Sequence, residues 1–233
     1  KKELRGVSTR TREEKLTPYI EEKDLYRLLD NLESTDPEMF LATGLISVFG
    51  LRISELAVLK VVDGKLTVGH IKNNENTANK KRKPRRAFAM DLIEMPNLGN
   101  RLIQYYDSKL IKLPSTIQKQ INEYKTKNRF GDVGQAYTDK LKKNPIWKEI
   151  TKANPDITAY SLRHRFAHMA HKGSAVPISV KDCAVAMGHS PSTHLDFYGS
   201  YTTELAIEKA FERHAENRIE VWIIDSRSKI GSN

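Results

Sequence analysis

Proline residues that directly follow a helix-capping side chain mark four expected helix starts in this chain. The pairs are Thr17-Pro18, Asp36-Pro37, Asn144-Pro145 and Ser190-Pro191. Ser, Thr, Asp and Asn side chains accept hydrogen bonds from the free N–H groups of a helix start, and proline fits the first turn, where no N–H donor is needed. The pattern therefore predicts helices from one end of the chain to the other, and a mostly helical protein.

Apolar residues at helical spacing support these starts. A first helix is expected over about 18–32, with four leucines on one face, and a second from Pro37 to a stop at Gly50. Further helices are expected over about 54–59, from near 98, 114, 134 and 145, from Ser161 to Gly173, over 178–187, over 191–198 and from 202 onward.

A small sheet is expected after the helix over 54–59 and before the helix that begins near 98. Residues 65–71 alternate apolar and polar side chains, and 86–92 contain a second short apolar segment. The long polar turn between them is strongly basic near its end. A basic hairpin of this kind suits binding to the phosphates of a nucleic-acid backbone, although a solvated loop has the same composition. The candidate DNA-binding residues are Lys80, Lys81, Arg82, Lys83, Arg85 and Arg86.

The charge balance favours a polyanionic partner. Lys and Arg number 39 against 29 Asp and Glu, which gives a net charge of +10. DNA or RNA is the expected partner before an anionic membrane, and a basic protein without such a partner is the alternative. The single cysteine, Cys183, lies in an apolar helical context and is expected to be a core thiol of a reducing compartment. No apolar run reaches membrane-spanning length, so we expect a cytoplasmic protein.

Five side chains form a set suited to phosphodiester chemistry. Arg52 stands in the phrase Gly-Leu-Arg-Ile-Ser-Glu-Leu, Lys72 stands beside the basic turn and Arg163 lies in a helix. His189 follows a glycine, and Tyr198 comes nine positions later. Guanidinium groups present paired N–H donors to phosphate oxygens, and a phenol can attack phosphorus. Because no cluster of Asp and Glu has the spacing of metal ligands, we expect cleavage without metal or cofactor.

The order of these motifs resembles the catalytic domain of the tyrosine recombinases, the phage-integrase family, over roughly residues 40–200. The resemblance implies an α+β, mostly helical catalytic domain with a small antiparallel sheet. It also implies a site-specific recombinase or integrase that cleaves and rejoins double-stranded DNA through a 3′-phosphotyrosine intermediate, without metal or ATP. Such proteins act as homo-oligomers on DNA, as tetramers in the synapse, and a bacterial or phage host is implied.

The resemblance also implies a role for each residue of the set. Arg52 and Arg163 would neutralise the charge that develops on the phosphate oxygens, and His189 would add a donor. Tyr198 would be the nucleophile, while Lys72 would protonate the leaving 5′ oxygen. Tyr201 is a rival nucleophile, but the nine-residue gap from His189 favours Tyr198.

Two further residues belong to the predicted site. The family usually has a histidine three positions before the second arginine, where this chain has Tyr160. A phenol can donate a hydrogen bond to a phosphate oxygen, but with an ordinary pKa of about 10 it is a poor base. A tyrosine packed at the helix start is the alternative. Glu55, three residues after Arg52, would position that arginine, or form an ordinary surface ion pair with it.

The chain divides into a basic linker over 1–16, a catalytic domain over 17–201 and a C-terminal helix and tail over 202–233. The tail contains the apolar run 221–224, which is expected either to dock on a neighbouring subunit or to pack in cis. His164, His168 and His171 have the spacing of a metal-binding helix face, but the sequence shows no cysteine or carboxylate nearby to complete a site.

Three functional classes stay open at the level of sequence. The first is the recombinase or integrase. The second is a telomere resolvase or type IB topoisomerase, which shares the cleavage chemistry but makes hairpins or relaxes supercoils. The third is a catalytically silent DNA-binding module.

Overall fold

The computed structural model describes residues 18–69, 84–127, 131–172 and 178–199, together with Glu208, Phe211, Glu212, Ala215 and Glu216. Several predicted features lie outside the described residues. These are the linker over 1–16, Lys72, the basic tip at 80–83, Tyr201 and the tail at 221–224.

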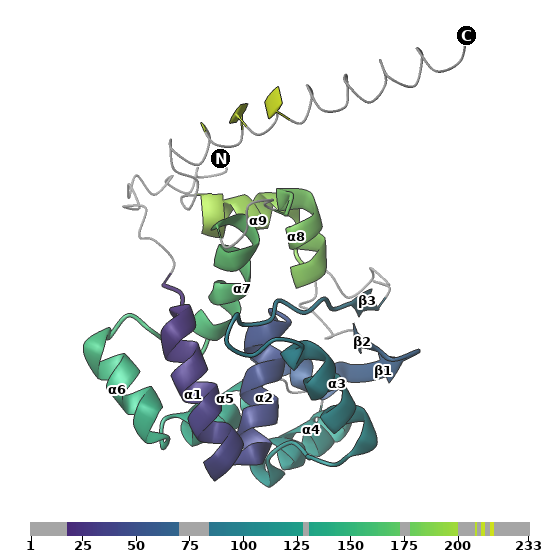
Figure 1. Ribbon diagram of the computed structural model, residues 1–233. Helices are drawn as coiled ribbons and strands as arrows, with labels where there is room; N and C mark the ends of the chain where they lie inside the picture. The colour runs from purple at the N-terminus through teal and green to yellow at the C-terminus, as the bar shows by residue number, and fades with distance from the viewer. Residues whose placement is uncertain are drawn as a thin grey trace, which may run out of the picture.

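The described chain is mostly helical, with a small antiparallel sheet, so the predicted fold class is confirmed. The helices are α1 (Glu22–Thr35), α2 (Pro37–Val48), α3 (Leu98–Ser108), α4 (Ser115–Lys127), α5 (Gly131–Leu141), α6 (Pro145–Ala153), α7 (Ser161–Lys172), α8 (Val180–Met187) and α9 (Pro191–Tyr198), and a 3-10 helix η1 spans Ile53–Val58. Helices α7, α8 and α9 gather at one end, beyond the C-terminal end of α2, and α1 to α6 make up the other end (Figure 1).

Three of the four predicted helix starts are confirmed by their capping hydrogen bonds. Asp36, Asn144 and Ser190 each accept a hydrogen bond from the backbone N–H three residues ahead, at 3.0 to 3.1 Å. The start at Pro18 was wrong, because α1 begins at Glu22. Ile20 is buried, and its backbone N–H donates to the carbonyl of Ser161. The segment before α1 is therefore held against the start of α7 and does not join the helix.

The sheet has three strands, β1 (Leu59–Val62), β2 (Lys65–Val68) and β3 (Arg85–Arg86), paired antiparallel in the order β1-β2-β3. Strand β1 was not predicted. The turn that joins β1 to β2 is Asp63-Gly64, and both residues have positive φ, 50° and 68°, as in the tightest hairpins.

The predicted strand over 86–92 was mostly wrong, because β3 ends at Arg86. Ala87 still donates to Leu66 of β2, but Met90 donates to the carbonyl of Val48 at the end of α2, at 2.8 Å. The chain leaves the sheet at this point because its backbone groups find partners on α2.

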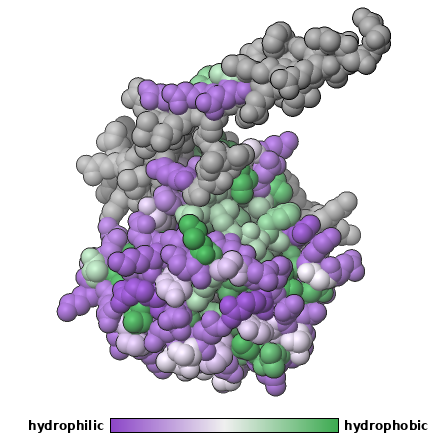
Figure 2. Space-filling model, viewed as in Figure 1, coloured by the Kyte–Doolittle hydropathy of each residue, from purple (hydrophilic) through white to green (hydrophobic). Residues whose placement is uncertain are grey.

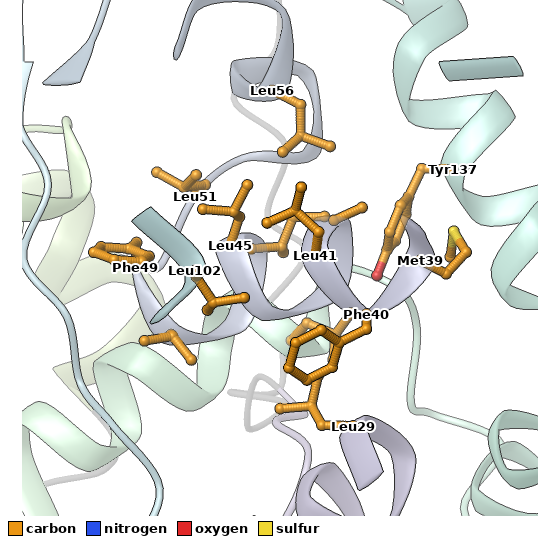
Figure 3. Packing of buried hydrophobic residues seen from close by; sticks show 14 of the residues in the cluster. Leu29, Met39, Phe40, Leu41, Leu45, Phe49, Leu51, Leu56, Leu102 and Tyr137 are labelled. Atoms are coloured by element: carbon orange, nitrogen blue, oxygen red, sulfur yellow. The ribbon is translucent and has the colours of Figure 1, made fainter. Parts of the chain in front are cut away.

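Helix α2 is the centre of the core, with every residue from Met39 to Val48 buried. Its neighbours α1, α3 and α7 pack around it, and Figure 3 shows Leu29 and Leu102 against its apolar side chains. A Cβ on Gly44 would lie 2.8 Å from the side chain of Leu102, so α3 packs directly on the helix backbone. Each leucine buried in this way contributes about 1.5–3 kcal/mol. The end of α2, which leads to Arg52, is therefore firmly held.

On the face in Figure 2 the described residues are mostly hydrophilic, and hydrophobic ones occur in smaller groups between them. Among the described residues, no helix combines the length and the apolar character needed to cross a bilayer.

Candidate active site

The turn after α2 brings Arg52 and Arg163 together. Gly50 has φ +59°, and a Cβ there would lie 2.6 Å from the ring of Phe166 on α7. A side chain at this position would therefore push α7 away. With glycine in place, Arg163 of α7 donates to the carbonyl of Gly50, and Arg52 follows two residues later.

Glu55 lies among three arginines. Its carboxylate accepts hydrogen bonds from Arg52 Nη1 at 2.9 Å and from Arg85 Nη2 at 2.7 Å, and it lies 3.8 Å from Arg163 Nη1. The backbone N–H of Arg52 also donates to it, at 2.8 Å. Glu55 is only 4% exposed. One buried carboxylate thus holds three guanidinium groups close together, and the local charge remains positive.

Arg163 is almost fully buried and faces the interior. Its Nη2 donates to the carbonyl of Met187 at 2.8 Å and lies 3.3 Å from His189 Nδ1. Arg52 Nη2 donates to the carbonyl of Gly188, the next residue along. Burial lowers the pKa of Arg163, and the nearby Arg52 lowers it further. The two arginines fix the end of α8, where Gly188 turns the chain with φ +73°.

Three histidines form a hydrogen-bonded chain that starts at Arg163. Because an arginine side chain only donates, His189 Nδ1 is the acceptor, and Nε2 of the neutral ring carries the proton. His189 Nε2 donates to His194 Nδ1 at 2.8 Å. His194 Nε2 then donates to His171 Nε2 at 2.6 Å. Arg163 therefore sets the direction of every hydrogen bond in this chain.

The histidines of the chain stay neutral near neutral pH. Burial lowers the pKa of His189 to about 3, and the charge of Arg163 adds to this shift. Burial likewise lowers the pKa of His194 to about 4, with His171 and Arg163 contributing. Neutral rings are what the chain requires, since His189 and His194 each accept one hydrogen bond and donate one.

Tyr198 reaches the same site from α9. Its hydroxyl lies 2.7 Å from Nδ1 of His164, and the tyrosine is only 4% exposed. Burial raises the pKa of Tyr198 to about 12, although the charge of Arg163 opposes the shift. Burial lowers the pKa of His164 to about 4, with Arg163 adding to it. Near neutral pH the phenol is therefore the donor, and the neutral ring of His164 is the acceptor.

His164 was missed as a member of the active site. From the sequence it was considered only as one of three histidines on a metal-binding helix face, whereas the structure separates the three. His164 contacts Tyr198, His168 stacks on Tyr19 with ring centroids 3.7 Å apart, and His171 meets His194. One feature of the sequence could have identified His164 as a site residue, namely that it directly follows Arg163. Residues 161–167 of α7 are all buried, so both side chains face the interior.

Tyr160 lies at the edge of the site. It is 41% exposed, and its carbonyl accepts hydrogen bonds from the backbone N–H groups of Arg163 and His164. Its ring meets the ring of His164 edge-on, with centroids 4.9 Å apart. Tyr160 thus belongs to the start of α7 and also borders the side chains that surround Tyr198.

Arg85 was expected to bind DNA from the basic hairpin, but its guanidinium group lies against the end of α8 and Glu55. Its Nη1 donates to the carbonyl of Ala186 at 2.6 Å, and its Nη2 donates to Glu55. A Cβ on Gly188 would lie 2.4 Å from its Nε. Arg85 therefore links the sheet to the end of α8. Its neighbour Arg86 points to the surface, with its guanidinium 4.8 Å from the ring of Phe88.

The structure brings together Arg52, Glu55, Tyr160, Arg163, His189 and Tyr198 of the predicted site and adds Arg85 and His164. Lys72 and the basic residues Lys80 to Lys83 lie outside the described residues. Cys183 is buried, as expected. It also lies beside His171 and His194. No cysteine was expected near the histidines of the 164–171 face, and for His171 that expectation was wrong.

Comparison with known proteins gives structural neighbours only. No family model and no curated protein matches the chain. Two of the neighbours are recombinases, and one of these two is described as site-specific. The crystal structure of XerA recombinase has a TM-score of 0.47 at 15% identity, covering 86% of this chain and 66% of that one. XerH recombinase, in a post-cleavage complex with palindromic difH, has a TM-score of 0.47 at 15% identity, covering 87% of this chain and 54% of that one. This chain therefore spans less than two thirds of the length of either.

Proposed function

We propose that this protein is a site-specific DNA recombinase or integrase that cleaves and rejoins double-stranded DNA through a 3′-phosphotyrosine intermediate on Tyr198. One observation carries the proposal: the Tyr198 hydroxyl donates to a neutral histidine inside a site where two arginines converge. A buried phenol with a proton acceptor and concentrated positive charge is suited to attack on a phosphodiester.

In this mechanism Arg52 and Arg163 act on the phosphate in different ways. The side chain of Arg52 is 33% exposed and has N–H donors beyond the two that contact Glu55 and Gly188, so it binds the non-bridging oxygens directly. Arg163 lies beneath the surface and contributes its charge at short range. Both charges stabilise the five-coordinate phosphorus more than the starting diester, because the negative charge increases as the bond forms.

His164 takes the proton of the nucleophile. As the oxygen of Tyr198 bonds to phosphorus, its proton moves to His164 Nδ1, and the 5′ oxygen leaves with a proton that we assign to Lys72. The pKa of Tyr198 is raised to about 12 and that of His164 is lowered to about 4, so a phenolate formed before the attack on phosphorus is unfavourable. Proton transfer therefore accompanies bond formation to phosphorus. In the reverse step, His164 returns the proton as a 5′ hydroxyl displaces the tyrosine.

Tyr198 must become accessible before it reacts with a duplex. Because the whole residue is only 4% exposed, its hydroxyl does not reach a phosphate on a DNA backbone. Helix α9 is short and packs mainly on α8, so a small rotation of α9 that opens one side of the hydroxyl and keeps its contact with His164 is enough to admit a phosphate. We propose that DNA binding, together with assembly into a tetrameric synapse through the segment 202–233, promotes this movement.

Duplex DNA with a nick near the scissile phosphate tests the proposal. Loss of the short 5′ fragment traps the protein–DNA adduct, which a denaturing gel resolves. A covalent adduct supports the proposed chemistry, whereas DNA binding without an adduct identifies a silent DNA-binding module. Intact substrates then separate the enzyme classes. Joined sites indicate recombination, hairpin ends indicate a telomere resolvase, and relaxed plasmid without recombinants indicates a type IB topoisomerase.

A further inference from the structure

Three helices each direct one metal-binding side chain to a common point at the His171 end of the histidine chain. The donors are a ring nitrogen of His171 on α7, Sγ of Cys183 on α8 and a ring nitrogen of His194 on α9, all within 4.8 Å of one another. Cys183 and His194 are buried, and His171 is half-buried. The proposed cleavage mechanism gives no task to His171 or Cys183.

We propose that His171, Cys183 and His194 bind a zinc-type divalent cation that fastens α9, the helix carrying Tyr198, to α7 and α8. Imidazole nitrogens and thiolates are the ligands that Zn²⁺ usually takes in proteins, whereas Mg²⁺ and Ca²⁺ require oxygen ligands. Three protein ligands leave one coordination position for water or for a further ligand. The site differs from the metal face considered on sequence grounds, because its ligands come from three helices.

The geometry needs only small side-chain movements to close a coordination shell. Zn–N bonds of about 2.0–2.1 Å in a tetrahedral shell place two ligand nitrogens ~3.3 Å apart. The Nε2 atoms of His171 and His194 are 2.6 Å apart, so they separate by a fraction of an ångström to admit the ion. The thiol of Cys183 has only a weak partner to give up, the thioether of Met187 at 3.9 Å. On binding, the thiol loses its proton to solvent and the thiolate sulfur bonds the metal.

Metal binding also reverses the direction of the hydrogen bonds in the histidine chain. Without metal, His194 carries its proton on Nε2, the nitrogen that meets His171. A metal on Nε2 moves that proton to Nδ1, which then donates to His189 Nε2, a usual arrangement for a metal-ligating histidine. His189 must in turn carry its proton on Nδ1, opposite the N–H donor of Arg163. The bound ion therefore breaks the contact between Arg163 and His189, and no net proton is exchanged along the chain.

This last step links the metal to cleavage and rests on the proposed function. A His189 released from Arg163 has an N–H to offer to a phosphate oxygen. The binding site itself does not depend on that function, so its test is made without DNA.

Cobalt is the direct probe, because a thiolate bound to Co²⁺ gives an intense near-ultraviolet charge-transfer band and a tetrahedral ion gives strong visible bands. We expect both bands to saturate at one Co²⁺ per chain and to disappear when Zn²⁺ is added. Cys183→Ser should remove the charge-transfer band, and His194→Ala should weaken binding at least tenfold. The matched control is His168→Ala, which removes another half-buried histidine of α7 and should bind Co²⁺ like the wild type.

Two measurements on the wild-type protein cover the case in which the variants unfold. Since Cys183 is the only cysteine, its alkylation in mild denaturant reports on this site alone, and Zn²⁺ should slow it at least tenfold. Zn²⁺ should also raise the thermal midpoint. A Co²⁺ spectrum without the thiolate band, or alkylation unaffected by Zn²⁺, would overturn the proposal and leave a metal-free histidine chain. Neither result bears on whether Tyr198 forms a DNA adduct.

Discussion

Nδ1 of His164 lies 2.7 Å from the hydroxyl of Tyr198, and both groups are buried beside Arg163. In the recombinase pattern a histidine is expected at position 160, where this chain has an exposed tyrosine. The structure supplies an imidazole four residues later, one turn along the same helix. A proton acceptor is thus present next to Tyr198, the proposed nucleophile, even though the expected histidine is absent.

Replacement of His164 should slow adduct formation. His164→Gln keeps an acceptor for the Tyr198 hydroxyl but cannot take its proton, and we expect a loss of roughly 10²-fold or more on a nicked substrate. The wild-type rate should show no titration of this group between about pH 5 and 8, because its pKa is about 4. In the variant the rate should rise with pH, since solvent must accept the proton. DNA affinity should be unchanged, and His168→Ala should cleave like the wild type. An unchanged rate and pH profile would mean that His164 only packs against Tyr198.

Stability should fall as the pH drops from about 6.5 toward 5. Burial lowers the pKa values of His164, His168, His189 and His194 to about 3 or 4. The unfolded chain takes up protons on these rings below about pH 6.5 while the folded chain does not, so unfolding is favoured as pH falls. Most carboxylates titrate below this window. Urea midpoints at pH 7.5, 6.5 and 5.5 check the prediction, and equal midpoints at all three would contradict it.

Glu55 should matter far more to stability than an exposed carboxylate. Glu55→Gln leaves Arg52, Arg85 and Arg163 without their common anionic partner, and we expect a loss of about 3 kcal/mol or more in the free energy of unfolding. Glu149→Gln is the control, because Glu149 pairs with Arg27 at the surface, at 2.7 Å with both side chains well exposed. It should cost under about 1 kcal/mol. Equal effects in urea unfolding would show that the buried carboxylate does not organise the arginines.

The two parts of the basic segment should respond differently to neutralisation. Replacing Lys80, Lys81, Arg82 and Lys83 together by Gln should leave stability unchanged. It should also lower the log–log salt slope of DNA binding by about 0.9 for each phosphate that the protein no longer neutralises. Arg85→Gln should instead lower stability, because Arg85 joins Glu55 to the end of α8. Salt titrations and urea unfolding of both variants give the comparison. An unchanged slope in the fourfold variant would mean that those residues do not bind DNA.

The helix starts that depend on neighbouring residues could be predicted from the sequence. Asp36, Asn144 and Ser190 cap helices because each needs only its own side chain and the next few N–H groups. The signal at Pro18 failed because burial of Ile20 against α7 outweighs a local helix start. Strand β1 was missed although its Asp63-Gly64 turn is a recognised hairpin signal.

Only those residues of the candidate site that belong to the ordered motifs could be identified from the sequence. Arg52, Arg163, His189 and Tyr198 were identified by their order along the chain. The partners His164 and Arg85 depend on hydrogen bonds between residues 34 and 101 positions apart. Those hydrogen bonds follow from how α9 packs near α7 and how β3 meets α8, which no local spacing encodes. The approach of Cys183 to His171 has the same origin.

The assignment of Tyr198 as the nucleophile is most directly tested by adduct formation in Tyr198→Phe. The change removes only the hydroxyl, so DNA affinity should stay within about twofold of wild type, while the covalent band on a denaturing gel should disappear. Tyr201→Phe is the matched control and should form the adduct normally. We predict that peptide mapping of the wild-type adduct finds the nucleotide on Tyr198. An adduct that persists in Tyr198→Phe, or one that maps to Tyr201, would contradict the assignment.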